Sequence, residues 1–184
     1  LLADLPETTT RRKHEVDLRL MLFRAYLTRG EIGPMTATLM GAVETAKALG
    51  DQRRLALATA QLAMAQWMQG NHVAAAGSAR FVLEHAERTD DLPLQIFGKH
   101  TLANAEHGRG RLKDAISLHR QIIETLAQHG IENQRLGWAG LPSVMSRAFL
   151  GWFLIEAGQF DDARKQIEAG CVLADAAKQP YSQV

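Results

Sequence analysis

The chain has 184 residues, of which 46% are hydrophobic and 22% are charged, a balance typical of soluble globular proteins. Its 21 lysines and arginines nearly cancel its 20 aspartates and glutamates, so we expect no general affinity for nucleic acid or for an anionic membrane. No apolar run approaches the ~20 residues that are needed to cross a bilayer.

Four glycines in matching contexts divide the chain into repeats. They are Gly30, Gly70, Gly110 and Gly158, and they lie 40, 40 and 48 residues apart. A leucine stands eight residues before each one, and a methionine or alanine stands five residues after it. A period of about 40 residues with this pattern is typical of stacked helical hairpins. The sequence therefore predicts an all-α fold, an α-solenoid of four antiparallel helix hairpins.

Apolar residues at helical spacing predict two helices in each repeat, with the glycine between them. The first repeat, about 12–50, contains Arg12–Thr28 and Pro34–Leu49; the second, 51–90, contains Gln52–Gln69 and His72–Thr89. The third, 91–130, contains Leu92–Gly108 and Arg111–His129; the fourth, 143–179, contains Ser143–Ala157 and Phe160–Lys178. Glycine suits the left-handed residue that ends a helix. Asp51 and Asp91 are expected to be N-caps.

Small residues recur where the helices should pack. Two antiparallel helices approach closely only where one presents a small side chain, and the expected crossing points are Ala75, Ala115 and Ala163. The residues sixteen after each glycine should face the next repeat; these are Ala46, Ala86, Leu126 and Ala174. Most of the stability should come from these contacts, since one hairpin cannot bury its own apolar face.

An insertion in the third interval breaks the period. It covers the loop 130–142, whose three glycines and one proline disfavour a continuous helix. A loop of this length usually packs or has a function. We expect it to fold back onto the helices with Trp138 as its anchor. Trp138 then either fills the gap between repeats three and four or contacts a partner.

Three stretches add a resemblance to a known family. The leucine, small-residue and glycine pattern resembles the tetratricopeptide repeat, although the period is 40 rather than 34 residues. The segments Leu5–Thr8 with His14–Leu20, Gly140–Ala148, and Gln179–Ser182 resemble the repeat region of large bacterial regulators described as predicted ATPases or adenylate/guanylate cyclases. The resemblance implies one tetratricopeptide-like repeat domain over 1–184, acting as a regulatory arm with the catalytic domains upstream.

The chain ends carry further expectations. The absence of an initiator methionine and of a signal peptide, together with a single cysteine, predicts a cytoplasmic fragment of a longer protein. That cysteine, Cys171, lies on the apolar side of a predicted helix and should be buried. Pro180–Ser182 is similar to the start of a fifth repeat. The last hairpin should therefore expose an apolar face, which could drive formation of a homo-oligomer.

The residues predict no catalytic centre. No phosphate-binding Gly-x-x-x-x-Gly-Lys-Ser/Thr motif occurs, and the histidine and cysteine spacings match no metal motif. His100 and His107 lie seven residues apart on one helix, about 10 Å along its axis, and cannot chelate one ion. We therefore expect neither a cofactor nor a metal, and no enzyme activity in this segment.

The first helices of the repeats are the predicted binding site, because they line the concave side of a repeat array. The candidate groove residues are Arg24, Leu27, Met64, Trp67, Met68, His100, Asn104, His107, Trp152 and Ile155. This mixture of aromatic, thioether, imidazole and amide groups suits a peptide or helix from a protein partner. The partner could be an upstream domain of the same protein. The alternative is a sensor domain that binds a metabolite in the groove, and the residues alone leave both open.

Overall fold

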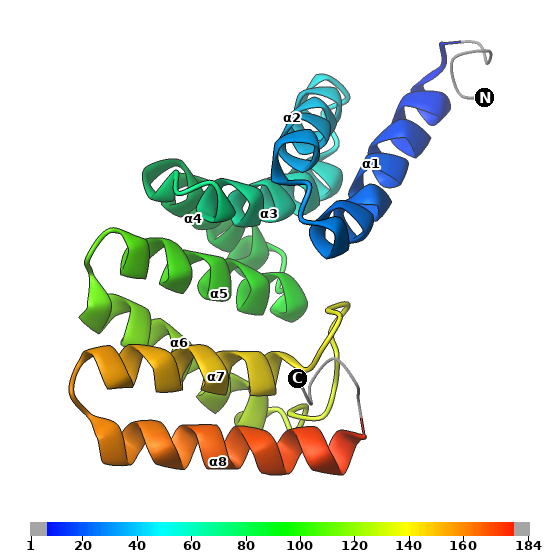
Figure 1. Ribbon diagram of the computed structural model, residues 1–184. Coiled ribbons are helices and arrows are strands. Elements are labelled where there is room, and N and C mark those ends of the chain that lie inside the picture. The colour runs from blue at the N-terminus through cyan, green and yellow to red at the C-terminus, as the bar shows by residue number, and fades with distance from the viewer. Residues whose placement is uncertain (1–6, 179–184) are drawn as a thin grey trace. The chain divides into compact units, whose positions relative to one another are not determined.

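The computed structural model describes residues 7–178, and within that range the chain is helical with no strand. The helices are α1 (Thr9–Arg29), α2 (Ile32–Ala48), α3 (Gln52–Met68), α4 (His72–Arg88), α5 (Leu92–Gly108), α6 (Leu112–Gln128), α7 (Pro142–Glu156) and α8 (Phe160–Ala177) (Figure 1). The predicted all-α fold of four helix hairpins is confirmed.

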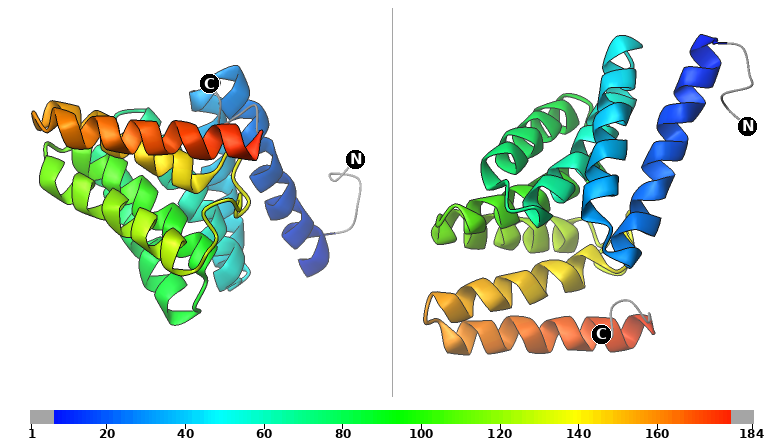
Figure 2. Two further views of the ribbon diagram at one scale, coloured as in Figure 1. Left: turned by 90° about the horizontal axis from the view of Figure 1, so that it is seen from below. Right: turned by 45° about the horizontal axis from the view of Figure 1, so that its top comes forward.

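The chain divides into two compact units, and the boundary falls inside α5, between Thr101 and Leu102. The first unit contains α1 to α4 and the start of α5. The second contains the rest of α5 with α6, α7 and α8. In the second unit, α7 and α8 run side by side and are joined by a short turn (Figure 2). The prediction of a single repeat domain over the whole chain stays a prediction.

The glycine of each repeat ends the first helix in the left-handed conformation. Its φ is 68° at Gly30, 77° at Gly70, 78° at Gly110 and 73° at Gly158. This region of φ is open to glycine at little cost because glycine has no Cβ. The second helix begins two residues after each glycine. The predicted glycine turns are therefore confirmed.

The helix starts follow local capping groups. The carboxylates of Asp51 and Asp91 accept hydrogen bonds from the backbone N–H of Arg54 (3.1 Å) and of Leu94 (3.0 Å), so both predicted N-caps are confirmed. Helix α1 begins three residues before the predicted Arg12, because the hydroxyl of Thr8 caps it. Two other helices also begin earlier than predicted: α2 by two residues, at Ile32, and α7 by one residue, at Pro142. A proline fits the first turn of a helix because the N–H groups there have no intrahelical partner.

The first unit is built from apolar clusters that join one hairpin to the next. Met35 and Leu39 of α2 are fully buried, and they pack with Leu62 and Ala65 of α3. Ala46 of α2 belongs to a second buried cluster with α1 and α3. A third cluster joins α3, α4 and the start of α5. It contains Ala56 and Ala60 of α3, Val82 and Ala86 of α4, and Leu94 of α5. The predicted role of Ala46 and Ala86 in contacting the next repeat is confirmed.

An ion-pair network ties α1 to the start of α3. The guanidinium of Arg54 donates two hydrogen bonds of 2.8 Å to the carboxylate of Asp17 and one of 2.7 Å to Asp51. These hydrogen bonds lower the pKa of Asp17. The pKa of Asp51 is lowered first by the backbone N–H of Arg54 and then by its side chain.

Replacing Arg54 with alanine should lower the free energy of unfolding by about 1 kcal/mol at neutral pH, since the network is partly exposed and screened by solvent. A carboxylate with a lowered pKa contributes stability above its unfolded-state value of 3.8 and loses it as the pH falls through its folded-state pKa. Denaturant titrations of the parent and Arg54→Ala should therefore differ at pH 7 and converge in strong acid. A gap that persists in acid would assign the effect to packing of the arginine stem instead.

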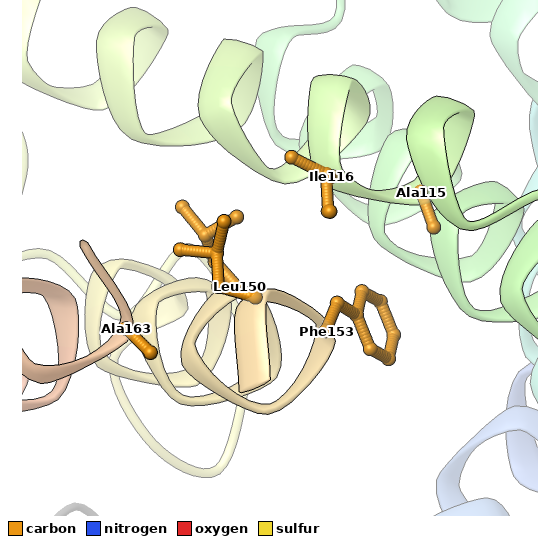
Figure 3. Packing of buried hydrophobic residues seen from close by; sticks show 6 residues of the cluster. Ala115, Ile116, Leu150, Phe153 and Ala163 are labelled. Atoms are coloured by element: carbon orange, nitrogen blue, oxygen red, sulfur yellow. The ribbon is translucent and has the colours of Figure 1, made fainter. Parts of the chain in front are cut away.

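The core of the second unit lies between α6, α7 and α8. Ala115 and Ile116 of α6 pack with Leu150 and Phe153 of α7, and Ala163 of α8 completes the cluster (Figure 3). Ala115 and Ala163 are 0% and 1% exposed, as expected for residues at helix crossings. The third predicted crossing residue, Ala75 in the first unit, is also 0% exposed.

Glycines make room for large neighbours at two helix contacts. A Cβ at Gly98 would lie 2.9 Å from Cγ of Leu83, where α5 meets α4. A Cβ at Gly151 would lie 2.6 Å from Cγ1 of Ile167, where α7 meets α8. Real Cβ atoms do not approach other atoms so closely, so these positions need glycine for packing rather than for backbone freedom.

The inserted loop follows α6 and packs through its last residues. Leu141 is 1% exposed, whereas Trp138 is only half-buried. The hydroxyl of Ser143 donates a 2.5 Å hydrogen bond to the carbonyl of Glu132, and Arg147 reaches the carboxylate of the same glutamate at 3.2 Å. The loop does fold back, but it is buried at Gly140, Leu141 and Pro142 rather than at the expected Trp138.

Cys171 is exposed, and the prediction that it would be buried is wrong. The buried residues of α8 are Ala163, Gly170 and Ala174. Cys171 lies about 100° around the helix from Gly170. The equivalent residues in α2, α4 and α6 are Val43, Leu83 and Ile123, which are half-buried against the following repeat. Within the described range, no later helix follows α8.

Candidate binding surface

The ten predicted groove residues occupy repeated positions on the first helices. Eight of them form four equivalent pairs, six and three residues before the repeat glycine: Arg24 with Leu27, Met64 with Trp67, Asn104 with His107, and Trp152 with Ile155. Their burial differs. Arg24, Leu27, Met68, Trp152 and Ile155 are exposed, whereas Met64, Trp67 and His107 are half-buried and His100 and Asn104 are buried.

In the first unit the accessible part of this set is mainly apolar. Leu27 on α1 and Met68 on α3 are 37% and 38% exposed. Met64 packs against the buried cluster of α1, α2 and α3, and Trp67 on the same helix is half-buried. Arg24 contributes an exposed cation on α1. The first unit therefore exposes apolar side chains and one cation on α1 and α3.

His100 cannot contact a partner from its place in the fold, because it is 2% exposed on α5. Burial disfavours the charged imidazolium and lowers the pKa of His100 to about 4. The ring is therefore neutral at physiological pH. His100 is therefore part of the interior and not of the accessible surface.

In the second unit, aromatic rings gather around Phe153 of α7. The ring of His107 stacks on Phe153 with centroids 4.2 Å apart and planes 10° apart. The ring centroid of Trp152 lies 5.0 Å from that of His107 and 5.3 Å from that of Phe153. Trp152 is 45% exposed. On the inner side, His119 of α6 stacks on Phe149 at 5.7 Å. Phe153 is completely buried, so the exposed Trp152 packs against an aromatic ring that belongs to the core.

Two polar contacts orient this aromatic group. Nε2 of His107 and Oε2 of Glu156 lie 2.7 Å apart at the surface. Below them, Nε2 of His119 lies 3.3 Å from Oδ1 of Asn104, and both side chains are fully buried. The structure therefore brings Asn104, His107 and Trp152 of the predicted set into one group, and Asn104 supports it from inside. We call His107, Trp152 and Glu156 the aromatic–acidic patch.

The sequence prediction missed Glu156, Phe149, Phe153 and His119 in this group. A signal for three of them was present, because Phe149, Trp152, Phe153 and Glu156 follow helical spacing on α7. His119 lies among the buried residues of its own helix, α6, and spacing within that helix gives no sign of a contact with another one. Its contact with α7 depends on how the helices pack, which spacing within one helix does not reveal.

Other chemistry has little support in the described part of the chain. Within residues 7–178, no three histidine, cysteine, aspartate or glutamate side chains come together as a metal site. No helix in that range is long and apolar enough to cross a membrane. A hollow in the second unit is lined by residues around the start of α6 and the end of α7, including Arg111, Ile116 and Gln159, and contains none of the ten candidates.

Comparison with known proteins identifies the fold. Two solved structures of one Podosopora anserina protein, described as a kinesin light chain with nearly identical TPR-like repeats, resemble this chain. One gives a TM-score of 0.64 at 18% identity and covers 89% of this chain and 76% of that chain. The other gives 0.63 at 19% identity and covers 97% and 82%. No protein-family model and no curated protein matches the chain.

The chain therefore has a tetratricopeptide-like α-solenoid fold. At this level of identity the likeness concerns the fold alone.

Proposed function

We propose that the chain is a non-catalytic repeat module that binds a protein partner through the first helices of its hairpins. The observation that carries this proposal is the aromatic–acidic patch on α5 and α7. A half-exposed tryptophan on a buried aromatic base, beside a surface carboxylate, has the properties of an interface hot spot. Large, rigid side chains of this kind lose little conformational entropy on binding.

The chemistry of the patch indicates the kind of segment that fits. Trp152 offers an exposed ring face for an apolar anchor or for a cation. The carboxylate of Glu156, which is 40% exposed, lies beside His107 and can accept further hydrogen bonds. A helix or extended segment that carries an apolar side chain next to a lysine or arginine would satisfy both groups. In the first unit, Leu27, Trp67 and Met68 would add apolar contacts on α1 and α3.

The resemblance of the three sequence stretches extends the proposal to a biological context. The module would be the repeat arm of a bacterial signalling ATPase or nucleotide cyclase in the cytoplasm, and its partner would be a catalytic domain of the same protein. This context rests on the resemblance of those stretches. Within Gly140–Ala148, Leu141 precedes α7 as its N-cap residue, and the buried Pro142 and Ser143 begin the helix that carries Trp152 and Glu156.

The test is calorimetric titration of the chain with purified ATPase and cyclase domains from regulators of this kind. Trp152→Ala and Trp67→Ala should each weaken binding by roughly 2 kcal/mol or more, about thirtyfold, while helicity persists. Met40→Ala is the matched control, because Met40 is 50% exposed on a second helix and should leave the Kd unchanged. Arg24→Ala should have a small effect, since a charge at an exposed position is screened by water and salt.

Two results would contradict separate parts of the proposal. If a folded Trp67→Ala, Trp152→Ala double variant still binds, the site is not on the first helices, and the loop around Trp138 is the next surface to mutate. If the parent binds none of these domains, the signalling context is wrong. A selection from a peptide library, repeated with the double variant, then tests the surface by itself.

A further inference from the structure

The carboxylate of Glu156 has one polar partner in the part of the chain that the structure describes. Its Oε2 lies 2.7 Å from Nε2 of His107. A neutral imidazole with its proton on Nε2 can donate this hydrogen bond and leave the carboxylate with its full negative charge. The other oxygen, Oε1, accepts no hydrogen bond from the described residues. The aromatic–acidic patch therefore presents a negative charge and an open acceptor at the surface.

The arginines closest to the patch along the chain pair with a different carboxylate. Arg109 and Arg111 follow His107, and both pair with Glu106, Arg109 at 3.3 Å. Glu106 is 3% exposed, so a buried carboxylate holds both guanidinium groups at the turn between α5 and α6. Glu156 is also the last residue of α7, where the partial negative charge of a helix end favours a cation. The patch is therefore complementary in charge to a cation that a partner supplies.

Three exposed side chains share one surface at the end of α7. Trp152 is 45% exposed and Ile155 is 46% exposed. Helical spacing of three and four residues places the indole ring of Trp152 beside both Ile155 and Glu156. The imidazole of His107 fixes the arrangement, because it stacks on buried Phe153 and contacts both the indole ring and the carboxylate. One bound side chain can therefore touch an aromatic ring, an aliphatic group and a carboxylate together.

From this combination we infer that the patch binds an arginine side chain of the partner, an inference that rests on the proposed function. The guanidinium lies flat on the indole of Trp152 and donates N–H groups to Glu156, while its aliphatic stem packs against Ile155. Arginine fits better than lysine, because the guanidinium is planar, carries several N–H donors in one plane and is more weakly hydrated than an ammonium group. A weakly hydrated cation loses less free energy when it leaves water for a half-exposed ring.

The experiment titrates the isotope-labelled chain with three capped dipeptides and follows the indole N–H signal of Trp152 by NMR. The dipeptides are acetyl-Leu-Arg-amide, acetyl-Leu-Lys-amide and acetyl-Leu-citrulline-amide; citrulline replaces the guanidinium with a neutral urea of similar shape. The arginine peptide should shift the signal in a saturable way. The citrulline peptide should bind about tenfold more weakly because it lacks the charge, and the lysine peptide about threefold more weakly because it cannot stack.

A matched pair of variants tests the carboxylate. Glu156→Gln keeps the shape of the side chain and removes its charge. It should raise the Kd of the arginine peptide about fivefold, since a charge-assisted hydrogen bond is lost, and leave that of the citrulline peptide nearly unchanged. Glu124→Gln is the control, because Glu124 is exposed on α6 of the same unit and its replacement changes the net charge equally. It should leave every Kd unchanged.

Three results would overturn the inference. They are the absence of a saturable shift with the arginine peptide, equal affinity for the three peptides, and an equal effect of Glu156→Gln and Glu124→Gln. The proposed function fails in a different way, because its titration uses protein domains and tryptophan variants. A domain that loses affinity with Trp152→Ala but not with Glu156→Gln would support the proposed binding surface and contradict its assignment to arginine.

Discussion

Replacing Phe153 with alanine should lower the free energy of unfolding by about 3–5 kcal/mol, the largest loss that we expect from one substitution in this chain. Phe153 is 0% exposed, belongs to the apolar cluster with Ala115, Ile116 and Leu150, and stacks with the ring of His107. Truncation would leave a cavity between helices that cannot close without moving α6 relative to α7. Denaturant unfolding followed by far-UV circular dichroism measures the loss.

The adjacent tryptophan provides a matched control for this prediction. Trp152 is 45% exposed, so Trp152→Ala should reduce stability by at most about half as much, although it removes a larger side chain. The two substitutions therefore separate two functions of neighbouring residues: Phe153 supports the second unit, and Trp152 is available to a partner. Equal losses from both would show that Trp152 is part of the core and weaken its assignment as a contact residue.

Replacing Leu39 with alanine should lower the free energy of unfolding by about 2–5 kcal/mol. Leu39 is 0% exposed on α2 and packs with Phe23 of α1 and with Leu62 and Ala65 of α3. One side chain therefore joins the first hairpin to the second. Hydrogen exchange should show the loss of protection mainly in α1, α2 and α3, since repeats transmit stability through their nearest neighbours.

The next residue along α2 is the control for Leu39. Met40 is 50% exposed, and its equivalents in the later repeats are the exposed Arg80, Arg120 and Glu168. Met40→Ala should therefore change stability by about 0.5 kcal/mol or less. A similar loss for both variants would mean that α2 is packed on both sides.

The two controls also connect stability with binding. In the partner titration, Met40→Ala should leave the Kd unchanged. Trp152→Ala should weaken binding about thirtyfold. A variant that loses binding but keeps its unfolding free energy identifies a contact residue. A variant that loses both identifies a residue that acts through the fold.

The sequence by itself determined the helices and the turns between them. A glycine at the end of each first helix, an apolar stripe at helical spacing and an aspartate before α3 and α5 act over a few residues of the chain. Their effect depends on local backbone geometry, so Gly30, Gly110 and Asp51 could be assigned correctly without any tertiary information. The small residues at helix crossings followed in the same way, since the repeat period shows which positions are equivalent.

The tertiary structure alone decided which side chains are accessible. Cys171 and Ile123 occupy equivalent positions, yet Ile123 packs against the next repeat and Cys171 is exposed, because burial depends on what covers a helix and not on the helix itself. The same reason separates buried His100 and Asn104 from Trp152, although all three were predicted on one face. The pairing of His107 with Glu156 joins residues 49 positions apart, and only the packing of α5 on α7 brings them together.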